Sequence, residues 1–430
     1  MKKATALLLS LLIMAGALSA CSSGGKAGTG AAAPESGGIS LSGGSGSGSY
    51  AVKDSAGDMP APSLAPVGEM AVPAVMPAPR PDERPYEPAP EPQAGMLTAA
   101  EWNDNEHFEF FTDVLGRSGW KSMQDTWRIY PLNRVAVRVT DPQTQEPVKG
   151  ASVVLMGEDG ALTSAVTDYS GRAWLYYDLS GHGDETPVRV TAEKGGVSAE
   201  AEITEGETSV ELNLAAPEDG GRTLDLMFVV DTTGSMGDEL EYLKTELRDV
   251  IHRVAGANEG LRIRLSVNFY RDEGDEYVVR PFDFTESVNE VVTQISKQYS
   301  DGGGDTPEAV EQAFKNALDE HDWSKESVKL MFFVLDAPPH ADKQSAPTDM
   351  RNCMTKAAEM GIRVIPIVCS GDSYETEYLM RTAAAVSGGT YAFLTDDSGI
   401  GNSHLEPTVG EYQVEQLNAL MTRLINKYCA

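Results

Sequence analysis

One stretch decides the fold of the C-terminal half: Leu224-Asp225-Leu226-Met227-Phe228-Val229-Val230, followed directly by Asp231-Thr232-Thr233-Gly234-Ser235. Its first part is almost continuously apolar, which is typical of a parallel strand covered on both faces. The pattern then changes to the spacing of a helix, with apolar residues at Leu240, Leu243, Leu247, Val250, Ile251 and Val254. A buried strand followed by an amphipathic helix indicates a sheet with helices on its faces.

Strands and helices continue to alternate over residues 222–429. We expect strands at residues 261–269, 277–284, 329–335, 362–368 and 390–394, and helices at residues 288–299, 307–319, 349–360, 374–386 and 411–428. This alternation predicts a doubly wound, Rossmann-like α/β domain over residues 222–429.

Polar residues that can bind a metal follow the strands of this domain. The candidate ligands are Asp231, Thr233 and Ser235 after the first strand, Asp305 and Thr306 before the helix at 307–319, and Asp336 after the strand at 329–335. Ligands of doubly wound sheets bind at the carboxyl ends of the strands, so the three loops are expected to meet at one edge. Carboxylates and hydroxyls without a thiolate suit Mg²⁺ or Mn²⁺ better than zinc.

Each loop also has a purely structural interpretation. Taken singly, an aspartate can cap a helix or begin a turn, and Pro307-Glu308 is a common helix start. Three acidic loops at strand ends seldom arise together by chance, which favours the metal site.

The stretch 231–235 resembles the Asp-x-Ser/Thr-x-Ser signature of the von Willebrand factor type A (vWA) domain and its metal-ion-dependent adhesion site. The segments 270–272, 302–308 and 336–340 resemble the subset of this family found in hemicentins and certain alpha-kinases. The resemblance implies that the Thr233 and Ser235 hydroxyls bind the metal, while Asp231 and Asp336 act directly or through water. It also implies that the cation captures an acidic side chain of a protein partner. Many members have a threonine in the second loop, and whether Asp305 or Thr306 takes that role here stays open.

Residues 132–216 alternate apolar and polar side chains with a period of two, as in Val135, Val137 and Val139. Short strands of this kind, separated by turn sequences, predict an antiparallel β-sandwich. The stretches 146–153 and 167–173 resemble the carboxypeptidase regulatory-like, transthyretin-like sandwich, which implies a non-catalytic spacer or binding module. His182 has no second histidine or cysteine close to it in the sequence, so we interpret it as a loop residue.

Residues 97–131 concentrate aromatic side chains, namely Trp102, Phe108, Phe110, Phe111, Trp120 and Trp127. We interpret them as the packing face of a short helical extension that docks on the sandwich.

The N-terminus has the features of a secreted lipoprotein. Lys2 and Lys3 precede a short apolar stretch, and residues 1–20 therefore read as a signal peptide. Leu18-Ser19-Ala20-Cys21 resembles the lipobox of bacterial lipoproteins, which implies diacylation of Cys21 and anchoring at the extracytoplasmic face of the cell membrane. Residues 21–96 are rich in glycine, serine and proline with few aromatics, and this composition predicts a disordered linker that lifts the domains off the membrane.

Three cysteines remain beside Cys21. A disulfide is permitted outside the cytoplasm, and we weakly favour a pair between Cys353 and Cys369, with Cys429 left over.

The composition separates the possible functions. A net charge of −31 argues against nucleic acid, because phosphate binding needs a surface rich in lysine and arginine. The sequence holds no His-Glu-x-x-His, phosphate-binding loop or nucleophile elbow, so we expect a binding protein and not an enzyme. The alternatives are a scaffold subunit of a cell-envelope complex and, less favoured, a metal-dependent hydrolase.

Overall fold

The computed structural model describes residues 91–183, 186–217, 223–257, 260–304, 306–371 and 373–430. The predicted signal peptide, Cys21 as the predicted lipidation site and the predicted linker up to residue 90 lie outside these described residues, as does Asp305.

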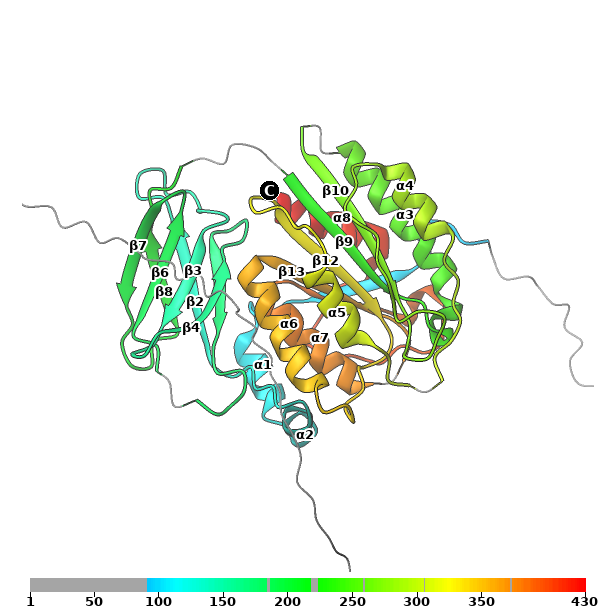
Figure 1. Ribbon diagram of the computed structural model, residues 1–430, viewed down its shortest axis with the longest axis horizontal. Helices are drawn as coiled ribbons and strands as arrows, with labels where there is room; N and C mark the ends of the chain where they lie inside the picture. Colours follow the sequence, from blue (N-terminus) through cyan, green and yellow to red (C-terminus); the bar gives the residue numbers. More distant parts are fainter. Residues whose placement is uncertain (1–90, 184–185, 218–222, 258–259, 305, 372) are drawn as a thin grey trace, which may run out of the picture. The chain divides into compact units, whose positions relative to one another are not determined.

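An eight-stranded sheet forms the centre of the C-terminal domain, in the order β11-β10-β9-β12-β13-β14-β1-β15. Its central strands β10, β9, β12 and β13 lie side by side in Figure 1. Its parallel part consists of β10 (Arg262–Tyr270), β9 (Thr223–Asp231), β12 (Val328–Leu335), β13 (Ile362–Val368) and β14 (Tyr391–Leu394). The stretch that opened the sequence analysis is β9, which pairs with β10 on one side and β12 on the other. The prediction of an α/β domain at the C-terminus is therefore confirmed.

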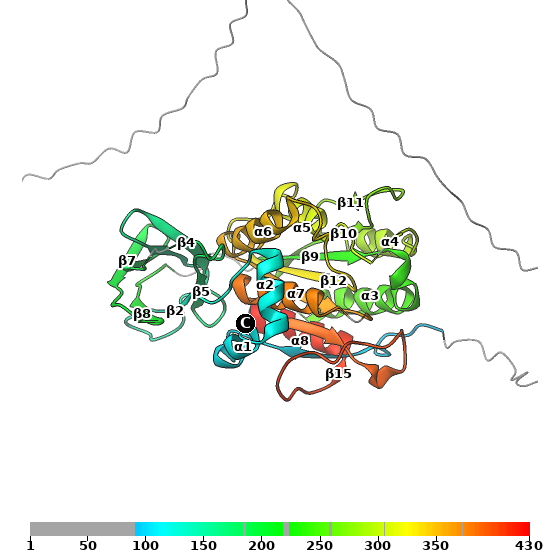
Figure 2. The same ribbon diagram turned by 90° about the horizontal axis from the view of Figure 1, so that it is seen from below.

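Helices cover both faces of this sheet. The helices α5 (Val310–Asp319), α6 (Ala346–Met360) and α7 (Tyr374–Ser387) share one hydrophobic cluster with Met227, Val229 and Phe333. The helices α3 (Leu240–Ala257), α4 (Val288–Ser296) and α8 (Leu417–Cys429) share the other with Leu226, Phe228 and Phe332. Figure 2 shows α5 and α6 on one side of the sheet and α3 and α8 on the other. Successive side chains of one strand thus enter two cores, which explains why β9 is apolar throughout.

Some predicted boundaries are wrong. The strand expected at 277–284 is only β11 (Val279–Arg280), and the helix expected at 411–428 begins at Leu417, after the short β15 (Glu415–Gln416). The helix expected at 307–319 begins at Val310, because the backbone of Glu308 instead bonds to the loop after β12 through Pro338 O.

The helical extension predicted at residues 97–131 contains two helices, but it begins with a strand that was not predicted. Residues Thr98–Trp102 form β1, which lies between β14 and β15 in the large sheet, and only then follow α1 (Phe108–Leu115) and α2 (Ser118–Trp127). The physical reason is that β14 would otherwise be an open sheet edge, which β1 covers.

The docking prediction for this extension is wrong in part. Trp120 packs edge-on against Tyr378 of α7, and Trp127 Nε1 donates to Glu375 at 2.5 Å. Towards the middle region, Phe108 contacts the Tyr176 ring and the Tyr176 hydroxyl bonds Asn105 Oδ1 at 2.8 Å. The extension therefore contacts both the middle region and the α/β domain.

A buried carboxylate fastens the start of this segment. Both carboxylate oxygens of Glu246, on α3, accept the N–H of Gly95 at 2.8 and 2.9 Å, and Oε1 also accepts those of Met96 and Leu97 at 3.0 and 3.2 Å. Charge-assisted bonds of this kind are stronger than neutral ones. We call residues 95–102 the strap: residues 95–97 are bound to α3 through Glu246, and residues 98–102 form β1.

Two small sheets make up the middle region. One has the order β5-β2-β8 and the other β4-β3-β6-β7. Their strands are β2 (Arg134–Thr140), β3 (Ser152–Met156), β4 (Ala161–Val166), β5 (Arg172–Tyr176), β6 (Arg189–Lys194), β7 (Val197–Glu202) and β8 (Ser209–Asn213). The pairing is antiparallel except between β2 and β8, which are parallel, so the prediction of a fully antiparallel arrangement is wrong at that pair. The exception arises because the chain changes sheets between β7 and β8.

The expected disulfide between Cys353 and Cys369 is not formed, and all three cysteines of the described residues, Cys353, Cys369 and Cys429, are buried. Cys353 lies on α6 in the hydrophobic cluster of one sheet face, whereas Cys369 follows β13 and belongs to the cluster of the other. The sheet separates the two thiols. Among the described helices, none has the length and apolarity that crossing a bilayer requires.

Glu246→Ala should release the strap, because three backbone N–H groups lose their acceptor. We expect the free energy of unfolding to fall by about 2–3 kcal/mol, measured by urea denaturation, together with faster amide exchange over residues 95–102. The matched control is Arg248→Ala, which truncates an exposed side chain of the same helix. Equal effects of both changes would contradict the role of Glu246.

Candidate metal centre

The first loop places one aspartate in a fixed orientation at the end of the central strand. Asp231 is fully buried, and its Oδ1 accepts the backbone N–H of Thr233 at 2.9 Å and the Thr233 hydroxyl at 2.7 Å. The Thr233 and Ser235 hydroxyls lie 3.1 Å apart, and the short helix η1 (Gly234–Asp238) carries Ser235 to an exposed position. The other carboxylate oxygen of Asp231, Oδ2, is buried without a hydrogen-bond partner.

The third loop brings a second aspartate beside the first. Because β9 and β12 are parallel, with Val334 opposite Val230, Asp336 follows its strand at nearly the same level as Asp231. Asp336 is buried, and its Oδ1 also has no hydrogen-bond partner. Burial, followed by the charge of Asp231, raises the pKa of Asp336 to about 7. Burial raises the pKa of Asp231 to about 6, although its bonds from Thr233 oppose the shift.

The second loop approaches the first through its glycines. Gly302 O accepts the backbone N–H of Gly234 at 3.1 Å, and Gly303 N donates to Asp275 Oδ2 at 3.0 Å. Gly302 has a φ of +78°, and a Cβ added there would lie 2.3 Å from the Asp275 carboxylate. Only glycine permits this approach. Thr306 is exposed, as Ser235 is, and its role as a ligand stays a prediction.

Glu308 is the residue that the sequence analysis missed. Its side chain is 2% exposed, and its Oε2 is a third buried carboxylate oxygen without a hydrogen-bond partner. Burial, and then the charges of Asp231, Asp272, Asp336 and Asp275, raise its pKa to about 9. The sequence signal was present in Pro307-Glu308 but was assigned to a helix start, whereas α5 begins only at Val310.

These oxygens fit a hard divalent cation. Three buried carboxylate oxygens lack partners. The buried Thr233 hydroxyl bonds Asp231, and the exposed Ser235 hydroxyl lies 3.1 Å from that of Thr233. Within the described residues, no three His, Cys, Asp or Glu side chains are grouped closely enough to hold an ion by themselves. The hydroxyl oxygens of Thr233 and Ser235 would therefore be needed to complete a shell, as oxygen coordination of Mg²⁺ allows.

His340 links two of the loops near the candidate site. Its Nε2 lies 2.8 Å from Asp272 Oδ1, and both side chains are buried. Lys343 Nζ pairs with Glu273 at 3.1 Å in the same area. These contacts join the loop after β12 to the loop after β10. His182, by contrast, is exposed, and its backbone N–H donates to Asp178.

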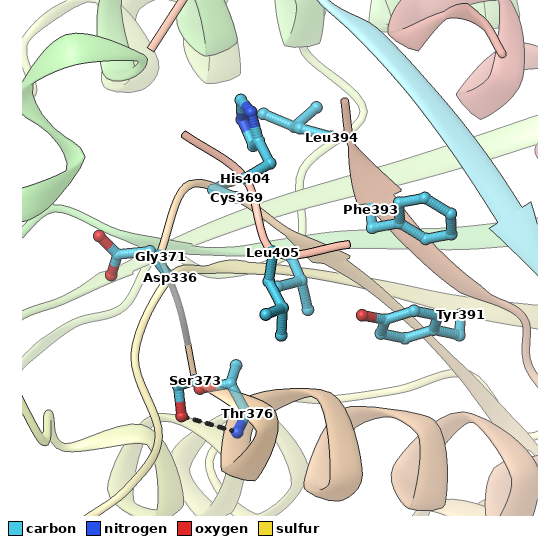
Figure 3. A pocket seen from close by; sticks show the side chains of 11 residues that line it. Asp336, Cys369, Gly371, Ser373, Thr376, Tyr391, Phe393, Leu394, His404 and Leu405 are labelled. Atoms are coloured by element: carbon cyan, nitrogen blue, oxygen red, sulfur yellow. Dashed lines mark hydrogen bonds between the residues drawn. The ribbon is translucent and has the colours of Figure 1, made fainter. Parts of the chain in front are cut away.

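A small pocket is lined in part by Asp336. Figure 3 shows Asp336 and His404 on one side of it and Tyr391 and Phe393 on the other. His404 Nε2 lies 2.9 Å from Glu239 Oε1 and its Nδ1 lies 2.7 Å from Asp396 Oδ1. Burial lowers the pKa of His404, but the two carboxylates outweigh burial and raise it above its ordinary value. His404 thereby fastens Glu239, which follows η1 directly, to the loop after β14.

Comparison with known proteins identifies the domain type. Residues 225–403 match the family model of the von Willebrand factor type A domain. A putative ariadne-like RING finger protein of Acanthamoeba polyphaga mimivirus is 30% identical over 122 residues, which are 28% of this chain and 12% of that protein. Alpha-protein kinase vwkA of Dictyostelium discoideum is 27% identical over 127 residues, which are 29% of this chain and 20% of that protein. The chain thus spans a fifth or less of the length of these relatives.

Two solved structures were also found. The conserved hypothetical protein BatB from Bacteroides thetaiotaomicron has a TM-score of 0.32 and 11% identity, and the match covers 48% of this chain and 98% of that one. Proximal thread matrix protein 1 from the mussel byssus has a TM-score of 0.34 and 16% identity, with 49% and 46% covered.

Asp336→Asn should stabilise the metal-free protein, because it removes one of several buried carboxylates that repel one another. We expect a gain of about 1–3 kcal/mol in the free energy of unfolding in EDTA, and loss of the rise in melting temperature on adding Mg²⁺. The exposed Asp342→Asn on the same loop is the control. Destabilisation by Asp336→Asn in EDTA would contradict the unpaired state of this carboxylate.

His404→Gln should destabilise the protein in a pH-dependent way. The folded state raises the pKa of His404, so its contribution to stability is complete below the ordinary pKa and is lost as the pH rises through the raised one. We expect a loss of about 1–3 kcal/mol at pH 5.5 and a smaller loss at pH 9, measured by denaturant unfolding. His182→Gln, in an exposed loop, should change neither value.

Proposed function

We propose that the vWA domain binds a divalent cation, Mg²⁺ or Mn²⁺, and through it a carboxylate of a protein partner. Asp231, Asp336, Thr233 and Ser235 would hold the cation, and Glu308 is added to the ligands proposed from the sequence. Asp305 and Thr306 remain candidates of the second loop. A bound cation would neutralise the repelling carboxylates and present an open coordination position to the partner.

One observation carries this proposal. Asp231 Oδ2 and Asp336 Oδ1 are buried at the ends of neighbouring parallel strands, and neither has a hydrogen-bond partner. A buried charged oxygen without a partner is costly unless a cation compensates it. The neighbouring Ser235, at an exposed position, supplies a hydroxyl where a partner can approach.

The cysteine and histidine side chains of the described residues favour a binding function over a catalytic one. Burial raises the pKa of Cys353 to about 12 and that of Cys369 well above its ordinary value, so both thiols stay protonated and unreactive. His340, beside the metal loops, is buried against Asp272 and already bonded to it. A vWA domain is usually non-catalytic, and the RING finger protein and the kinase share only a fraction of their length with this chain.

The remaining parts of the chain extend the proposal. We propose that Cys21 is lipidated and that residues 21–96 hold the domains at the extracytoplasmic face of the cell membrane. The middle region would be the carboxypeptidase regulatory-like sandwich that its sequence resembles.

A second candidate function is a scaffold subunit of an envelope complex. It is favoured by the contacts that join the middle region to the vWA domain. Arg363 Nη2 donates to Val166 O at 2.6 Å, and Tyr169 packs edge-on against Tyr428 of α8. A fixed arrangement of two domains suits assembly as well as adhesion.

Asp231→Ala should abolish both cation binding and partner capture. It removes a proposed ligand and also the hydrogen-bond acceptor that orients the Thr233 hydroxyl. Mg²⁺ affinity is measured by calorimetry, and partners are captured by crosslinking in cells with Mg²⁺ or with chelator. We expect at least a hundredfold loss of Mg²⁺ affinity. Unchanged affinity and capture would refute the proposal, and a constant set of envelope proteins retained in chelator would favour the scaffold.

Three further variants distinguish the second-loop ligands in the same assay. Glu308→Gln, Asp305→Asn and Thr306→Ala each remove one candidate oxygen donor or its charge. We expect Glu308→Gln to weaken Mg²⁺ binding more than Thr306→Ala, because Glu308 is buried with a free oxygen whereas Thr306 is exposed. The reverse order would favour Thr306 over Glu308 as the metal ligand.

A further inference from the structure

Exposed acids lie on two of the loops with candidate metal ligands and on the loop after β10, which contacts both through Asp275 and Asp272. Glu273 and Glu276 lie on the loop after β10, Asp301 on the glycine-rich loop, and Asp342 on the loop after β12. Their side chains are 52%, 56%, 70% and 85% exposed. We call these four residues the acidic rim.

Acids outnumber cations around the acidic rim. On residues 271–280, 299–304, 306–309 and 336–345, eight Asp and Glu side chains stand against three basic ones other than histidine, Arg271, Arg280 and Lys343. Arg280 is 32% exposed and pairs with Glu276 at 3.4 Å.

Arg271 is 1% exposed, and its guanidinium lies between the rings of Tyr277 and Tyr299. It is 3.8 Å from Glu276 and 3.9 Å from Asp301, so it partly offsets these two acids but is not accessible to a partner. Lys343 is 26% exposed and paired with Glu273. The surface around the metal site is therefore predominantly negative.

The interior of the site adds to this charge. Asp231, Asp336 and Glu308 each hold a buried oxygen without a partner, and Asp272 and Asp275 lie among the charges that act on Glu308. A partner that offered only a carboxylate would approach a surface of its own sign, and such juxtaposition disfavours binding.

We propose that the partner segment is of mixed charge: an acidic residue that binds the cation, flanked by lysine or arginine side chains that meet the acidic rim. This inference rests on the proposed function, because the acidic residue is placed by the cation. The rim acids act by charge complementarity, which selects among carboxylate-bearing partners and speeds association at low ionic strength. A segment with acidic flanks is excluded by the same charges.

Peptides of one length test this selection on the full chain. Each has a central Asp, flanked by two Lys, two Ser or two Glu, and a fourth has Lys flanks and a central Asn. We expect affinity in Mg²⁺ to fall from Lys to Ser to Glu flanks, on the order of tenfold per step. The preference should shrink between 50 and 500 mM NaCl, because salt screens exposed charges.

Neutralising the rim supplies the decisive variant. Glu273→Gln, Glu276→Gln, Asp301→Asn and Asp342→Asn combined should abolish the preference for Lys flanks and leave Mg²⁺-dependent binding of the Ser-flanked peptide. The matched control neutralises four exposed acids of the middle region, Glu158, Glu202, Glu205 and Glu211, and should keep the preference.

The outcomes separate the two proposals. Equal, Mg²⁺-dependent binding of all three Asp peptides would overturn the mixed-charge inference and leave carboxylate capture intact. Equal binding of the Lys-flanked Asp and Asn peptides, unaffected by chelator, would reveal attraction of cations alone and overturn carboxylate capture. Absence of binding by every peptide at millimolar concentration would overturn both.

Discussion

The structure depends on two aspartates that end neighbouring strands in the interior. Asp231 and Asp336 stand at the carboxyl ends of β9 and β12, and each keeps a buried oxygen without a partner. Parallel pairing forces this proximity, since strands in register end at the same level. Much of the surrounding architecture serves to hold the loops of these residues, through Thr233, the glycines 302 and 303, and the Asp272–His340 pair.

A second constraint concerns the edge of the sheet. The strap carries β1 into the gap between β14 and β15, and Glu246 satisfies the backbone groups where it begins. Further along the extension, Arg381 of α7 pairs with Asp104 at 2.6 Å and with Glu377 at 3.0 Å, and all three side chains are buried. The segment before the middle region is therefore built into the vWA domain, although the middle region separates the two in sequence.

Sequence periodicity predicted most of the vWA domain, because parallel strands buried on both faces and amphipathic helices leave strong local signals. It failed at β1, since a segment rich in aromatic residues has no local feature that names its strand partners. It failed again at Glu308, whose position after proline suits a helix start as well as a metal site. The pairing of Cys353 with Cys369 failed because closeness in sequence does not show which face of the sheet each thiol occupies.

The sequence by itself indicated the domain type and candidate oxygen donors at the strand ends, because a strand-end motif and its residue spacing are local properties of the chain. Only the tertiary structure decided which donors meet, which oxygens are left without partners, and where the N-terminal segment pairs. Those properties depend on strand register and burial, which arise from contacts between residues far apart in the chain. The sequence also fixed the excess of acids, whereas their arrangement around the metal loops is a consequence of the fold.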